Sequence, residues 1–523
     1  MTPTAHDTNA LTVDEMFRRA VDVRHDALAL EFHGHLWSFS EVLDESLRLA
    51  SVFANLGVRP GDRVTIFAEN SPHHVMSALA AARLGAIVAP MGAQLTAHEV
   101  AYLLTDCRPS VVLVDLARRP VVDAAISRSG HTPVVIETDG ASSDGYSTLL
   151  FAASPFAGPT EHDASSDLAI WYTSGTTGRP KGAVWSHRTF VTNSVGSYMV
   201  PMGVTTADAN LYFQSIGHNG LATSVIAPLL IGSRIHLRRR LSPPDIVAAI
   251  GDLGCTVTSG SPSSFSLVCH AAEQQGIAEL PSMRALCCGA TALTPEIYAR
   301  IRNLFPNAGI YTALGSSEAM FTIAPPSTVA AKPGTVGRAM PGQVVEVHDA
   351  NGQPCPPNTV GTIVMRGSSA MSRYWEKPDA TAAAMKGGWL TVGDLGRFDD
   401  DGDLWMAGRH ADVINTGGYN VYASEVEAVL LAVDGVRQAA VLGEPDPELG
   451  EVVVAYVTTH EGTGVDAEDL IAVCGERLAR YKNPRRVEVV VELPSTPLGK
   501  VQKFLIPTTE LEITSRWVRE ARK

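Results

Sequence analysis

The chain has 523 residues, of which 45% are apolar and 18% are charged, and its formal net charge is −14. Such a length and composition are typical of a globular enzyme with more than one domain. The acidic balance is spread along the chain. It disfavours a nucleic-acid-binding protein, which would carry a basic face.

The first part of the chain, up to about residue 165, alternates helical and strand patterns. Helical spacing occurs at 15–21 and in the alanine-rich stretch 77–84, and the second of these follows a cap and turn at Glu69–Pro72. Short apolar runs predict strands at 63–68, 86–90 and 111–115. Strands that alternate with helices predict parallel α/β sheets.

A loop rich in glycine and hydroxyl groups follows the next predicted strand. Residues 140–167 read as a surface connection, Leu168–Trp171 as the strand, and the loop then runs Thr-Ser-Gly-Thr-Thr-Gly-Arg-Pro-Lys-Gly. Small residues let backbone N–H groups approach an anion, while the hydroxyls and Lys181 add donors and charge. Gly182 follows this lysine, where a Walker loop needs Ser or Thr. The segment therefore predicts a polyphosphate loop of a different kind.

The remaining chain continues the α/β pattern and then changes character. Further strands are predicted at 235–237, 256–258 and 285–288. Short strands between Gly, Asn and Pro over 334–404 predict a small β subdomain. Residues 409–523 predict a compact α+β unit, with helices at 424–431 and 467–478 and strands at 438–442, 451–458 and 487–491.

The cysteines and the first residues of the chain indicate in which cellular compartment we expect the protein. The seven cysteines form no Cys-x-x-Cys and no Cys/His metal spacing, so we expect buried free thiols in a reducing cytosol. Met1–Leu11 is polar and lacks an apolar signal core. No apolar run reaches the roughly 18 residues that cross a bilayer. We expect a cytoplasmic protein with no membrane partner and no nucleic-acid partner.

Five segments, in order, resemble the motifs of the adenylate-forming superfamily, which includes acyl- and aryl-CoA ligases, peptide-synthetase adenylation domains and firefly luciferase. They are the loop 172–182, Gly315–Glu318, Gly393–Asp394, the junction 408–420 and Pro497–Lys500. The resemblance implies a large N-terminal adenylation domain of parallel α/β sheets plus a small β subdomain over 1–408. A hinge at 409–412 and a small mobile α+β domain over 413–523 would follow.

The resemblance also implies a two-step reaction that uses ATP, Mg²⁺ and CoA. A carboxylate attacks the α-phosphate of ATP to give an acyl-adenylate and pyrophosphate, and a thiol then displaces AMP. The expected function is an acyl-CoA ligase. Two alternatives stay open: an enzyme specialised for thiolation of a supplied adenylate, and a stand-alone adenylation enzyme that loads a carrier protein. Nothing in the sequence indicates the oxygen chemistry of luciferase.

Family positions imply the nucleotide site. Lys500 would bridge the acid's carboxylate and the α-phosphate, and Lys181 would be a second catalytic cation. Glu318 would hold Mg²⁺, and Asp394 would accept hydrogen bonds from the ribose. The remaining nucleotide-binding residues would be Thr173, Ser174, Gly175, Thr176, Thr177, Gly178, Gly289, Ala290, Leu314, Gly315, Ser317 and Arg409. Read without the family, Glu318 would be a solvated carboxylate, Asp394 a turn residue, and Lys500 and Lys503 exposed charges.

The second half-reaction has its own candidates. Gly417 and Gly418 would form a narrow channel for the pantetheine arm, because a Cβ there would obstruct it, and Tyr419 would also bind CoA. Tyr481 would stack on the CoA adenine, with Arg485 on a phosphate. The alternative places Tyr481 in the core and leaves Arg485 as solvated charge.

Three departures from the family pattern stand out. Leu314 replaces the aromatic residue that stacks on the ATP adenine, so nucleotide binding should be weaker by about 1 kcal/mol. Ala411 occupies the hinge position that normally carries Asp or Lys. The usual Phe-His pair of the acyl pocket is absent from 213–221, and either His218 or Gln214 could take the histidine's place.

The acyl pocket is expected between the His218 region and two later segments, 289–290 and 313–315. The pocket residues are predicted to be His218, Asn219, Gly220, Ser261 and Ala313, with further small residues at Gly217, Gly260, Gly289 and Ala290. No acidic residue is present to hold an amino-acid ammonium. The small side chains favour a bulky, largely apolar acid, either aryl or polycyclic. A carrier protein or a second copy of the chain remains open as a partner.

Overall fold

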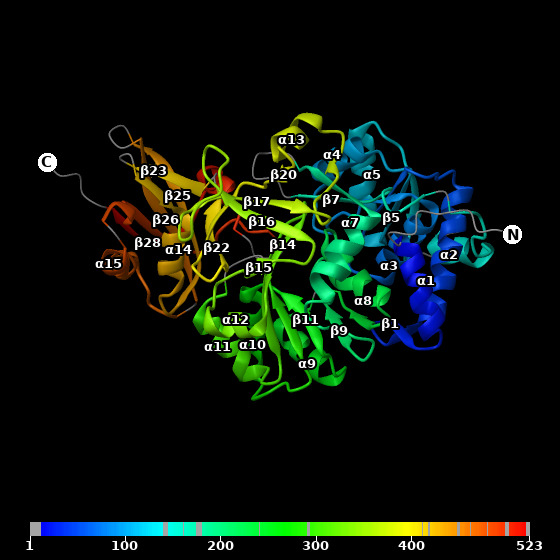
Figure 1. Cartoon of the computed structure of the whole chain (residues 1–523), viewed down its shortest axis with the longest axis horizontal. Helices are drawn as coiled ribbons and strands as arrows, with labels where there is room; N and C mark the ends of the chain where they lie inside the picture. The colour runs from blue at the N-terminus through cyan, green and yellow to red at the C-terminus, as the bar shows by residue number, and fades with distance from the viewer. Residues whose placement is uncertain are drawn as a thin grey trace. The chain divides into compact units, whose positions relative to one another are not determined.

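The computed structural model describes residues 12–139, 145–160, 162–173, 180–239, 241–289, 293–409, 412–416, 419–446, 450–460, 462–478, 480–496 and 501–518. The chain divides into two compact units (Figure 1). Unit 1 comprises Met1–Val345 and Val364–Val392, and unit 2 comprises Glu346–Ile363 and Gly393–Lys523. The hinge expected at 409–412 stays a prediction, since residues 410 and 411 lie outside the described ranges.

Unit 1 contains two large sheets, and the first has nine strands in the order β15-β14-β13-β12-β11-β9-β10-β1-β2. Every neighbouring pair from β13 to β1 is parallel, which confirms the predicted parallel α/β class. The strands are β1 (Leu28–Phe32), β2 (His35–Ser38), β9 (Ala209–Tyr212), β10 (Arg234–Leu237), β11 (Val257–Gly260), β12 (Ala285–Cys288), β13 (Gly309–Gly315), β14 (Met320–Ala324) and β15 (Arg338–Ala339).

Four amphipathic helices cover one face of this sheet. They are α9 (Pro243–Asp252), α10 (Pro262–Gln274), α11 (Pro295–Leu304) and α12 (Pro326–Ala331), and Figure 1 shows them together beside β11. Each of the first three begins with a Ser or Thr N-cap followed by proline, the signature of a helix start. Their apolar faces meet strand residues such as Leu286 and Ile310 in one buried cluster.

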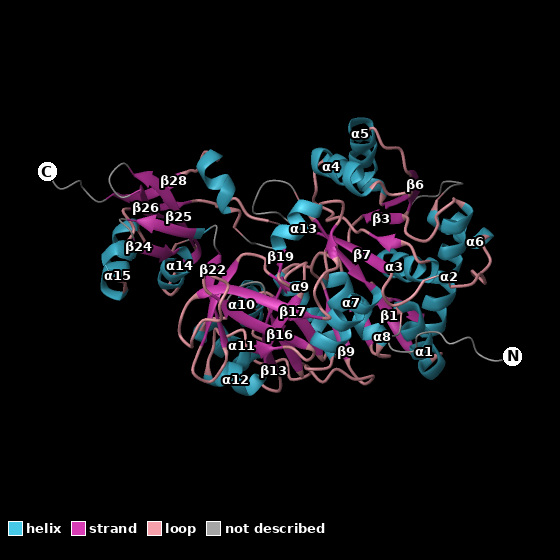
Figure 2. Cartoon of the chain, turned by 45° about the horizontal axis from the view of Figure 1, so that its top comes forward, coloured by secondary structure: helices cyan, strands magenta, loops and turns pink. Residues whose placement is uncertain are grey.

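The second sheet of unit 1 has seven strands in the order β18-β8-β7-β4-β3-β5-β6. These are β3 (Arg63–Phe67), β4 (Ile87–Val88), β5 (Val111–Val114), β6 (Val134–Glu137), β7 (Asp167–Tyr172), β8 (Gly182–Ser186) and β18 (Arg373–Tyr374). Helices α4 (Ala97–Cys107) and α5 (Arg119–Ser129) pack against each other and against this sheet (Figure 2). A capping box of Thr96 and Glu99 starts α4.

Helix α3 (Pro72–Leu84) is buried on nearly all sides, because its alanine-rich sequence has no wide polar face. Ser71 is its N-cap, Pro72 begins it, and Gly85 ends it with φ of 72°, so the predicted cap and turn are confirmed. The helix starts five residues earlier than the alanine run indicated.

The remaining helices of unit 1 include two segments of π-helix. They are η2 (Thr192–Met199) and η3 (Leu221–Ile226), and they pack against each other. The others are α1 (Val13–Arg24), α2 (Phe39–Asn55), η1 (Leu116–Arg118), α6 (Tyr146–Ala152), α7 (His187–Val191), α8 (Ala227–Leu230) and α13 (Pro378–Ala384). Helix α6 lies within 140–167, so this stretch is not simply a connection: its buried Tyr146 donates a hydrogen bond to Glu45 of α2.

Short strands between turns form a six-stranded sheet, as the sequence of 334–404 predicts. Its order is β19-β20-β17-β21-β22, and β16 also pairs with β17. The strands are β16 (Gln343–His348), β17 (Gly361–Gly367), β19 (Met385–Lys386), β20 (Trp389–Leu390), β21 (Asp394–Phe398) and β22 (Leu404–Arg409).

The carboxyl-terminal part of unit 2 is the predicted α+β fold, with a sheet in the order β24-β23-β26-β27-β28 and β25 paired to β26. Its elements are β23 (Val413–Thr416), β24 (Tyr419–Tyr422), α14 (Ala423–Leu431), β25 (Val436–Asp446), β26 (Gly450–Thr459), α15 (Ala467–Arg477), η5 (Arg480–Lys482), β27 (Arg486–Val490), η6 (Lys503–Thr508) and β28 (Ile513–Val518). Alternate residues of β26 face opposite sides: Val453 and Val457 pack under α14 and α15, while Val454 and Tyr456 face the other cluster.

The predicted free thiols are confirmed. All seven cysteines are unpaired, and all except the half-buried Cys355 are buried. Burial raises the pKa of Cys287 to about 12, so this thiol stays protonated and inert. Among the helices in the described ranges, none has the length and apolar character needed to cross a membrane.

Candidate functional site

The predicted polyphosphate loop connects two antiparallel strands, β7 and β8, which pair as far as Tyr172 and Gly182. At its base the Thr173 N–H donates to the Lys181 carbonyl at 2.9 Å, and the Lys181 N–H lies 3.4 Å from the Thr173 hydroxyl. The Tyr102 hydroxyl donates to the Pro180 carbonyl at 2.9 Å. Both ends of the loop are therefore fixed to the sheet.

The turn that carries Glu318 joins β13 to β14 and is held by side chains from other elements. Trp185 of β8 donates its indole N–H to the Ser317 carbonyl at 2.9 Å, and Asn219 donates to the Ser316 carbonyl at 3.0 Å. The Glu318 carbonyl accepts from the Met371 N–H at 2.7 Å. Three successive carbonyls are thus fixed, which sets the direction of the Glu318 side chain.

Glu318 is only 7% exposed, so the reading of a solvated carboxylate is wrong. A buried carboxylate needs a donor, and the Tyr374 hydroxyl donates to its Oε1 at 2.7 Å. The Nζ of Lys181 lies 5.4 Å from the centre of the same tyrosine ring. Burial, together with the Glu318 charge and hydrogen bond, raises the pKa of Tyr374 far above its usual range. One neutral tyrosine thus holds the loop's cation and the carboxylate.

The segment that follows Tyr374 is fastened to α4 by a second group of contacts. The Trp375 indole donates to the Asp106 carbonyl at 3.2 Å, and Lys377 forms an ion pair with the buried Asp106 carboxylate. The Tyr172 hydroxyl donates to the same carboxylate at 2.8 Å. Since Tyr172 ends the strand before the phosphate loop, Asp106 ties both flanks of the Lys181–Tyr374 pair to one helix.

In unit 2, the backbone register brings Asp394 and Arg409 directly opposite each other, at the start of β21 and the end of β22. Asp394 is 5% exposed and follows Gly393, whose φ of 82° permits a turn that other residues rarely adopt. Two motif residues fifteen positions apart in sequence thus become neighbours. The side chain of Arg409 lies outside the described atoms.

The loop between β9 and η3, which contains His218, is clamped by the buried Asn70. This side chain donates to the carbonyls of Gln214 and Arg238 at 2.5 and 3.0 Å, and its oxygen accepts from the Ile216 N–H at 3.1 Å. Asn70 follows β3 in the seven-stranded sheet, whereas Arg238 follows β10 in the other. The loop is therefore pinned where the two sheets of unit 1 approach each other.

His218 is a buried imidazole with two contacts at one ring nitrogen. Its Nδ1 accepts from the Gly220 N–H at 2.9 Å and lies 3.4 Å from the Asn219 Oδ1. Burial lowers its pKa, partly opposed by the contact with Asn219. Its Nε2 is buried and has no hydrogen-bond partner among the described residues.

Most of the glycines expected to leave room for the acid instead permit close packing. A Cβ at Gly217 would collide with the backbone of Met91 and Gly92, and one at Gly220 with the Tyr212 hydroxyl and the His218 ring, while one at Gly260 would press against Phe265 at 3.0 Å. At Gly289, by contrast, the Ala313 carbonyl at 3.9 Å is the only described atom nearby. Among the described residues, room is therefore found beside Gly289.

The other predicted pocket and nucleotide residues of unit 1 lie on the carboxyl-terminal edge of the nine-stranded sheet. Ser261 is buried and caps α10, its hydroxyl accepting from the Ser264 N–H at 3.1 Å. Ala313 is buried and Leu314 half-buried in β13, where Leu314 pairs with Thr322. Gly315 ends the strand against Met320, which leaves no space for a Cβ.

The residues predicted to contact CoA lie on the carboxyl-terminal part of unit 2. Tyr481 is 40% exposed on η5, so it is not a core residue, and the Lys482 Nζ lies 5.8 Å from its ring centre. Lys482 pairs with Glu425 at 2.5 Å. Arg485 is half-buried after η5, and its N–H donates to the Val453 carbonyl at 2.7 Å.

Lys503, expected to be an exposed charge, is instead part of an ion-pair cluster. Its Nζ lies 2.7 Å from Glu427 of α14 and 3.6 Å from Asp412. The contacts tie the start of η6 to the residue at the end of the expected hinge.

Several predicted residues lie outside the described residues. They are Ser174, Gly175, Thr176, Thr177, Gly178, Ala290, Ala411, Gly417, Gly418 and Lys500. For Tyr419 the structure places the backbone in β24 only.

Sequence reasoning did not single out Tyr374, Trp185 or Asn70, although each fixes a predicted residue. Tyr374 ends the two-residue strand β18, and the sequence marks Asn70 only as part of a cap and turn. Neither motif nor spacing marks such residues, because their partners lie far away in the sequence. In the part of the chain that the structure describes, no group of three His, Cys, Asp or Glu side chains could by itself hold a metal ion.

Two family models match the chain. One, described as AMP-binding enzyme, matches residues 17–375, and the other, described as AMP-binding enzyme C-terminal domain, matches residues 425–500.

Curated relatives and solved structures are similar over nearly the whole chain. A feruloyl-CoA synthase from Amycolatopsis sp is 31% identical and covers 93% of this chain and 95% of its own length. A long-chain-fatty-acid–CoA ligase from Mycobacterium tuberculosis is 31% identical and covers 88% of this chain and 90% of its own. The crystal structure of ATP-bound MatB from Rhodopseudomonas palustris has a TM-score of 0.85 and 29% identity, covering 95% of this chain and 98% of that one.

Proposed function

The chain belongs to the family of AMP-binding enzymes and is an acid–thiol ligase of the AMP-forming kind, and from this premise we propose which acid it activates and which residues act. An enzyme of this family uses ATP and CoA, and its substrate is a small-molecule carboxylic acid. The proposed acid is bulky and largely apolar, either aryl or polycyclic. It is converted to an acyl-adenylate and then to an acyl-CoA.

The arrangement of Lys181, Tyr374 and Glu318 is the observation that carries this proposal. Phosphoryl transfer places little covalent demand on the protein and relies on positioned charge around the phosphate oxygens. Lys181, at the end of the phosphate loop, lies over the Tyr374 ring, and the buried Glu318 accepts from the Tyr374 hydroxyl. In the proposed mechanism Lys181 binds the β- and γ-phosphates with Thr173 and the loop residues 174–178, while Lys500 contacts the α-phosphate and the acid.

The residues present fit a magnesium ion bound mainly by the substrate. Mg²⁺ in nucleotide sites is typically held by one or two carboxylates, phosphate oxygens and water. Glu318 offers one buried carboxylate, of which Tyr374 occupies Oε1, so its other oxygen remains for a cation. The ion would neutralise charge on the phosphates.

The paired strands β21 and β22 support a ribose site. Asp394 and Arg409 face each other in register, so a carboxylate for the ribose hydroxyls and a cation for ribose or phosphate come from adjacent positions. Gly289, Ala290, Leu314, Gly315 and Ser317 are the further nucleotide-binding residues that we propose, and Gly289, Leu314 and Gly315 lie at the edge of the nine-stranded sheet in unit 1. Ligands of open α/β sheets commonly bind at that edge.

The proposed second step uses residues of the carboxyl-terminal domain. The exposed ring of Tyr481 suits stacking on the CoA adenine, and Arg485 suits a phosphate. Gly417, Gly418 and Tyr419 would line the channel for the thiol arm. Ala411 would serve as the hinge between the two steps.

The class of acid is inferred from the predicted pocket. His218, Asn219, Gly220, Ser261 and Ala313 include no acidic side chain, so an amino acid's ammonium would have no partner. Room beside Gly289 favours a wide group next to the carboxylate. The feruloyl-CoA synthase and the fatty-acid ligase are both 31% identical to this chain, and the open side of Gly289 is our reason for preferring a ring-bearing acid.

The experiment is a panel of aryl, polycyclic, straight-chain and amino acids with ATP, Mg²⁺ and CoA, scored by mass spectrometry for acyl-AMP and acyl-CoA. We expect AMP, pyrophosphate and acyl-CoA from ring-bearing acids. Release of ADP and phosphate would contradict the adenylate mechanism, and a preference for straight chains would contradict the acid class. Parallel reactions with a carrier protein, and with chemically made acyl-AMP, test the two alternative functions. The mass of the native particle tests for a homodimer.

A further inference from the structure

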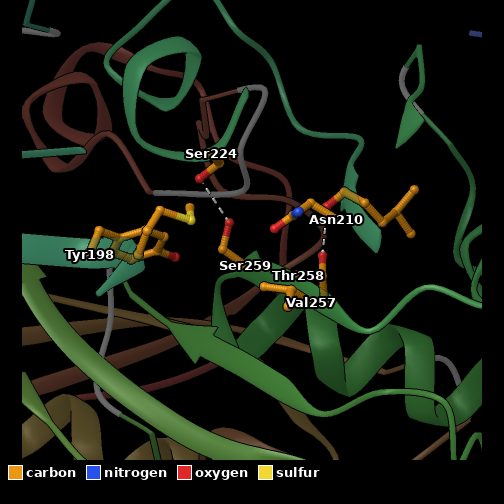
Figure 3. Close-up of a pocket in the computed structure, with 8 residues that line it drawn as sticks. Tyr198, Asn210, Ser224, Val257, Thr258 and Ser259 are labelled. Carbon is orange, nitrogen blue, oxygen red and sulfur yellow. Dashed lines mark hydrogen bonds between the residues drawn. The ribbon is translucent and has the colours of Figure 1, made fainter. Parts of the chain in front are cut away.

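A small cavity lies beside the two π-helices of unit 1, below the carboxyl-terminal edge of the nine-stranded sheet (Figure 3). It is formed by Tyr198 and Met199 of η2, Ser224 of η3, and residues of β9 and β11 that include Ser259. Its free volume is about 10 Å³, enough for one oxygen-sized group. π-Helical turns are rare and are frequently found at functional sites.

Hydroxyl groups converge on this cavity from three elements. The Ser224 and Ser259 hydroxyl oxygens are 3.2 Å apart, and Figure 3 shows both side chains pointing into the same space. Ser259 also interacts with the buried Tyr198 phenol, which in turn contacts the Cys287 thiol. Burial raises the pKa of Tyr198 well above its usual range, so this phenol stays a neutral donor.

The remaining capacity of these groups suits a ligand oxygen. A serine hydroxyl has one donor and two acceptor sites, so the bond between Ser224 and Ser259 leaves both residues able to bond further. Thr258, the other hydroxyl at the cavity, already donates to the Leu211 carbonyl at 3.0 Å. Ser224 and Ser259 are therefore the two groups that can address an oxygen placed there.

The cavity is lined by residues that neighbour the proposed acid site in the sequence and in the sheet. Ser259 precedes Gly260, whose carbonyl accepts from the Gly289 N–H at 3.0 Å, and Gly289 is the glycine with open room. Ser224 lies on η3, the helix that follows His218 and Asn219, and Asn219 holds the Glu318 turn. An acid seated beside Gly289 would therefore lie next to the strand that carries Ser259.

We propose that Ser224 and Ser259, the latter positioned by Tyr198, recognise a hydroxyl or carbonyl oxygen at the end of the acid remote from its carboxylate. The inference rests on the proposed function and narrows it: the favoured acids are oxygenated, and Ser224 and Ser259 are specificity-determining residues. An acid without that oxygen leaves the hydroxyls to bond only with one another, which is a loss of binding energy rather than a steric block.

The test compares matched pairs of acids that differ only in the distal oxygen. The pairs are para-hydroxycinnamate with cinnamate, para-hydroxyphenylacetate with phenylacetate, and ω-hydroxy fatty acids with unsubstituted ones, each assayed for acyl-AMP and acyl-CoA. In the wild-type enzyme we expect kcat/KM for the oxygenated member of the preferred pair to be higher by about tenfold. Ser224→Ala and Ser259→Ala should lower that ratio to about two, mainly by raising KM for the oxygenated acid.

Ser266→Ala on α10 is the matched control, since the Ser266 hydroxyl accepts from Arg300 of α11 and does not line the cavity. It should keep the wild-type ratio, and thermal denaturation should show all three variants folded. Tyr198→Phe, which keeps the ring, should reduce the ratio as well. Equal use of both members by the wild type, or an unchanged ratio in Ser224→Ala, overturns the inference while leaving the ligase proposal intact. If no acid is converted to acyl-CoA, both the ligase proposal and this inference are contradicted.

Discussion

Two motif residues, Glu318 of unit 1 and Tyr481 of unit 2, differ in how firmly the protein holds them. In unit 1, Glu318 is 7% exposed, its turn is fixed through three carbonyls, and its carboxylate meets Tyr374. In unit 2, Tyr481 is 40% exposed on a single 3₁₀ turn, and its neighbour Lys482 pairs with Glu425 near the surface.

This difference follows the two proposed steps. Charge that develops on a phosphate is stabilised best by groups that need not reorganise, and buried groups with fixed partners meet that condition. An aromatic ring that receives a nucleotide must stay accessible until the nucleotide arrives, so exposure is the price of that role. The contrast leads us to expect steep losses from changes in unit 1 and shallow losses at Tyr481.

The largest effect is expected for Glu318→Gln, which keeps the shape and the hydrogen bond to Tyr374 but removes the charge. Formation of acyl-AMP should fall about 10²- to 10³-fold, as for the loss of one electrostatic contact at a developing charge. Thiolation of chemically made acyl-AMP should change little. Glu279→Gln, at an exposed carboxylate, is the control and should behave as wild type. Equal loss in both half-reactions would contradict a role for Glu318 in the first step alone.

Tyr374→Phe sharpens the same comparison, because it removes the hydroxyl while the ring beside Lys181 remains. A hydrogen bond to a charged group contributes about 1.5–3 kcal/mol, so acyl-AMP formation should fall about 10- to 100-fold. Tyr374→Leu should lose more, since it also removes the ring's contact with the Lys181 ammonium. The matched control is Tyr298→Phe, because Tyr298 is a half-buried tyrosine on α11. A Phe variant with wild-type adenylation kinetics would show that Tyr374 is only a packing residue.

Buried histidines give unit 1 a pH dependence as well. The Val13 N–H donates to His187 Nδ1 at 3.2 Å, and burial followed by the neighbouring His162 lowers the pKa of His187 to about 3. His187 therefore takes up a proton near pH 6.5 in the unfolded state, but only near pH 3 in the folded state. The contribution of His187 to the free energy of unfolding is fully present above pH 6.5. It is lost as pH falls toward 3, by about 1.4 kcal/mol per pH unit.

The measurement is chemical denaturation between pH 4 and 7. His187→Asn keeps an acceptor for Val13 and should flatten the fall in unfolding free energy by about 1.4 kcal/mol per pH unit. His98→Asn, at an exposed position, should leave the slope as it is. A wild-type slope for His187→Asn would mean that His187 takes up its proton equally in the folded and unfolded states. That result would contradict a lowered pKa for His187.

The sequence predicted the elements better than the contacts between them. Apolar runs located β3, β5, β12 and β26 to within a residue or two, because strands in parallel sheets are continuous apolar segments. The π-helices η2 and η3 were not predicted, since their wider hydrogen-bonding pattern depends on packing and not on residue propensity.

The site shows the same limit. Motif order located Lys181, Glu318 and the Asp394–Arg409 pair, whereas Tyr374 lies 56 residues from Glu318 and only the folded chain unites them. Gly217 and Gly220 were interpreted as room for the acid, but the structure fills that room with Gly92 and Tyr212. A glycine in a sequence does not tell whether the missing Cβ makes way for a ligand or for the protein itself.

The smallest effect is expected at the exposed end of the comparison, in Tyr481→Ala. One aromatic stacking contact contributes roughly 0.5–1.5 kcal/mol, so KM for CoA should rise about three- to tenfold while the rate of acyl-AMP formation stays unchanged. Tyr481→Phe keeps the ring and should retain most of the wild-type affinity, which separates stacking from any contact of the hydroxyl. Because Lys482 lies over the ring and pairs with Glu425, Lys482→Met serves as a test of whether the ring needs that neighbour to hold its position. If Tyr481→Ala instead slows adenylation, the contrast between the fixed first-step carboxylate of Glu318 and the accessible second-step ring of Tyr481 is wrong, since an exposed residue would then be acting in the first step.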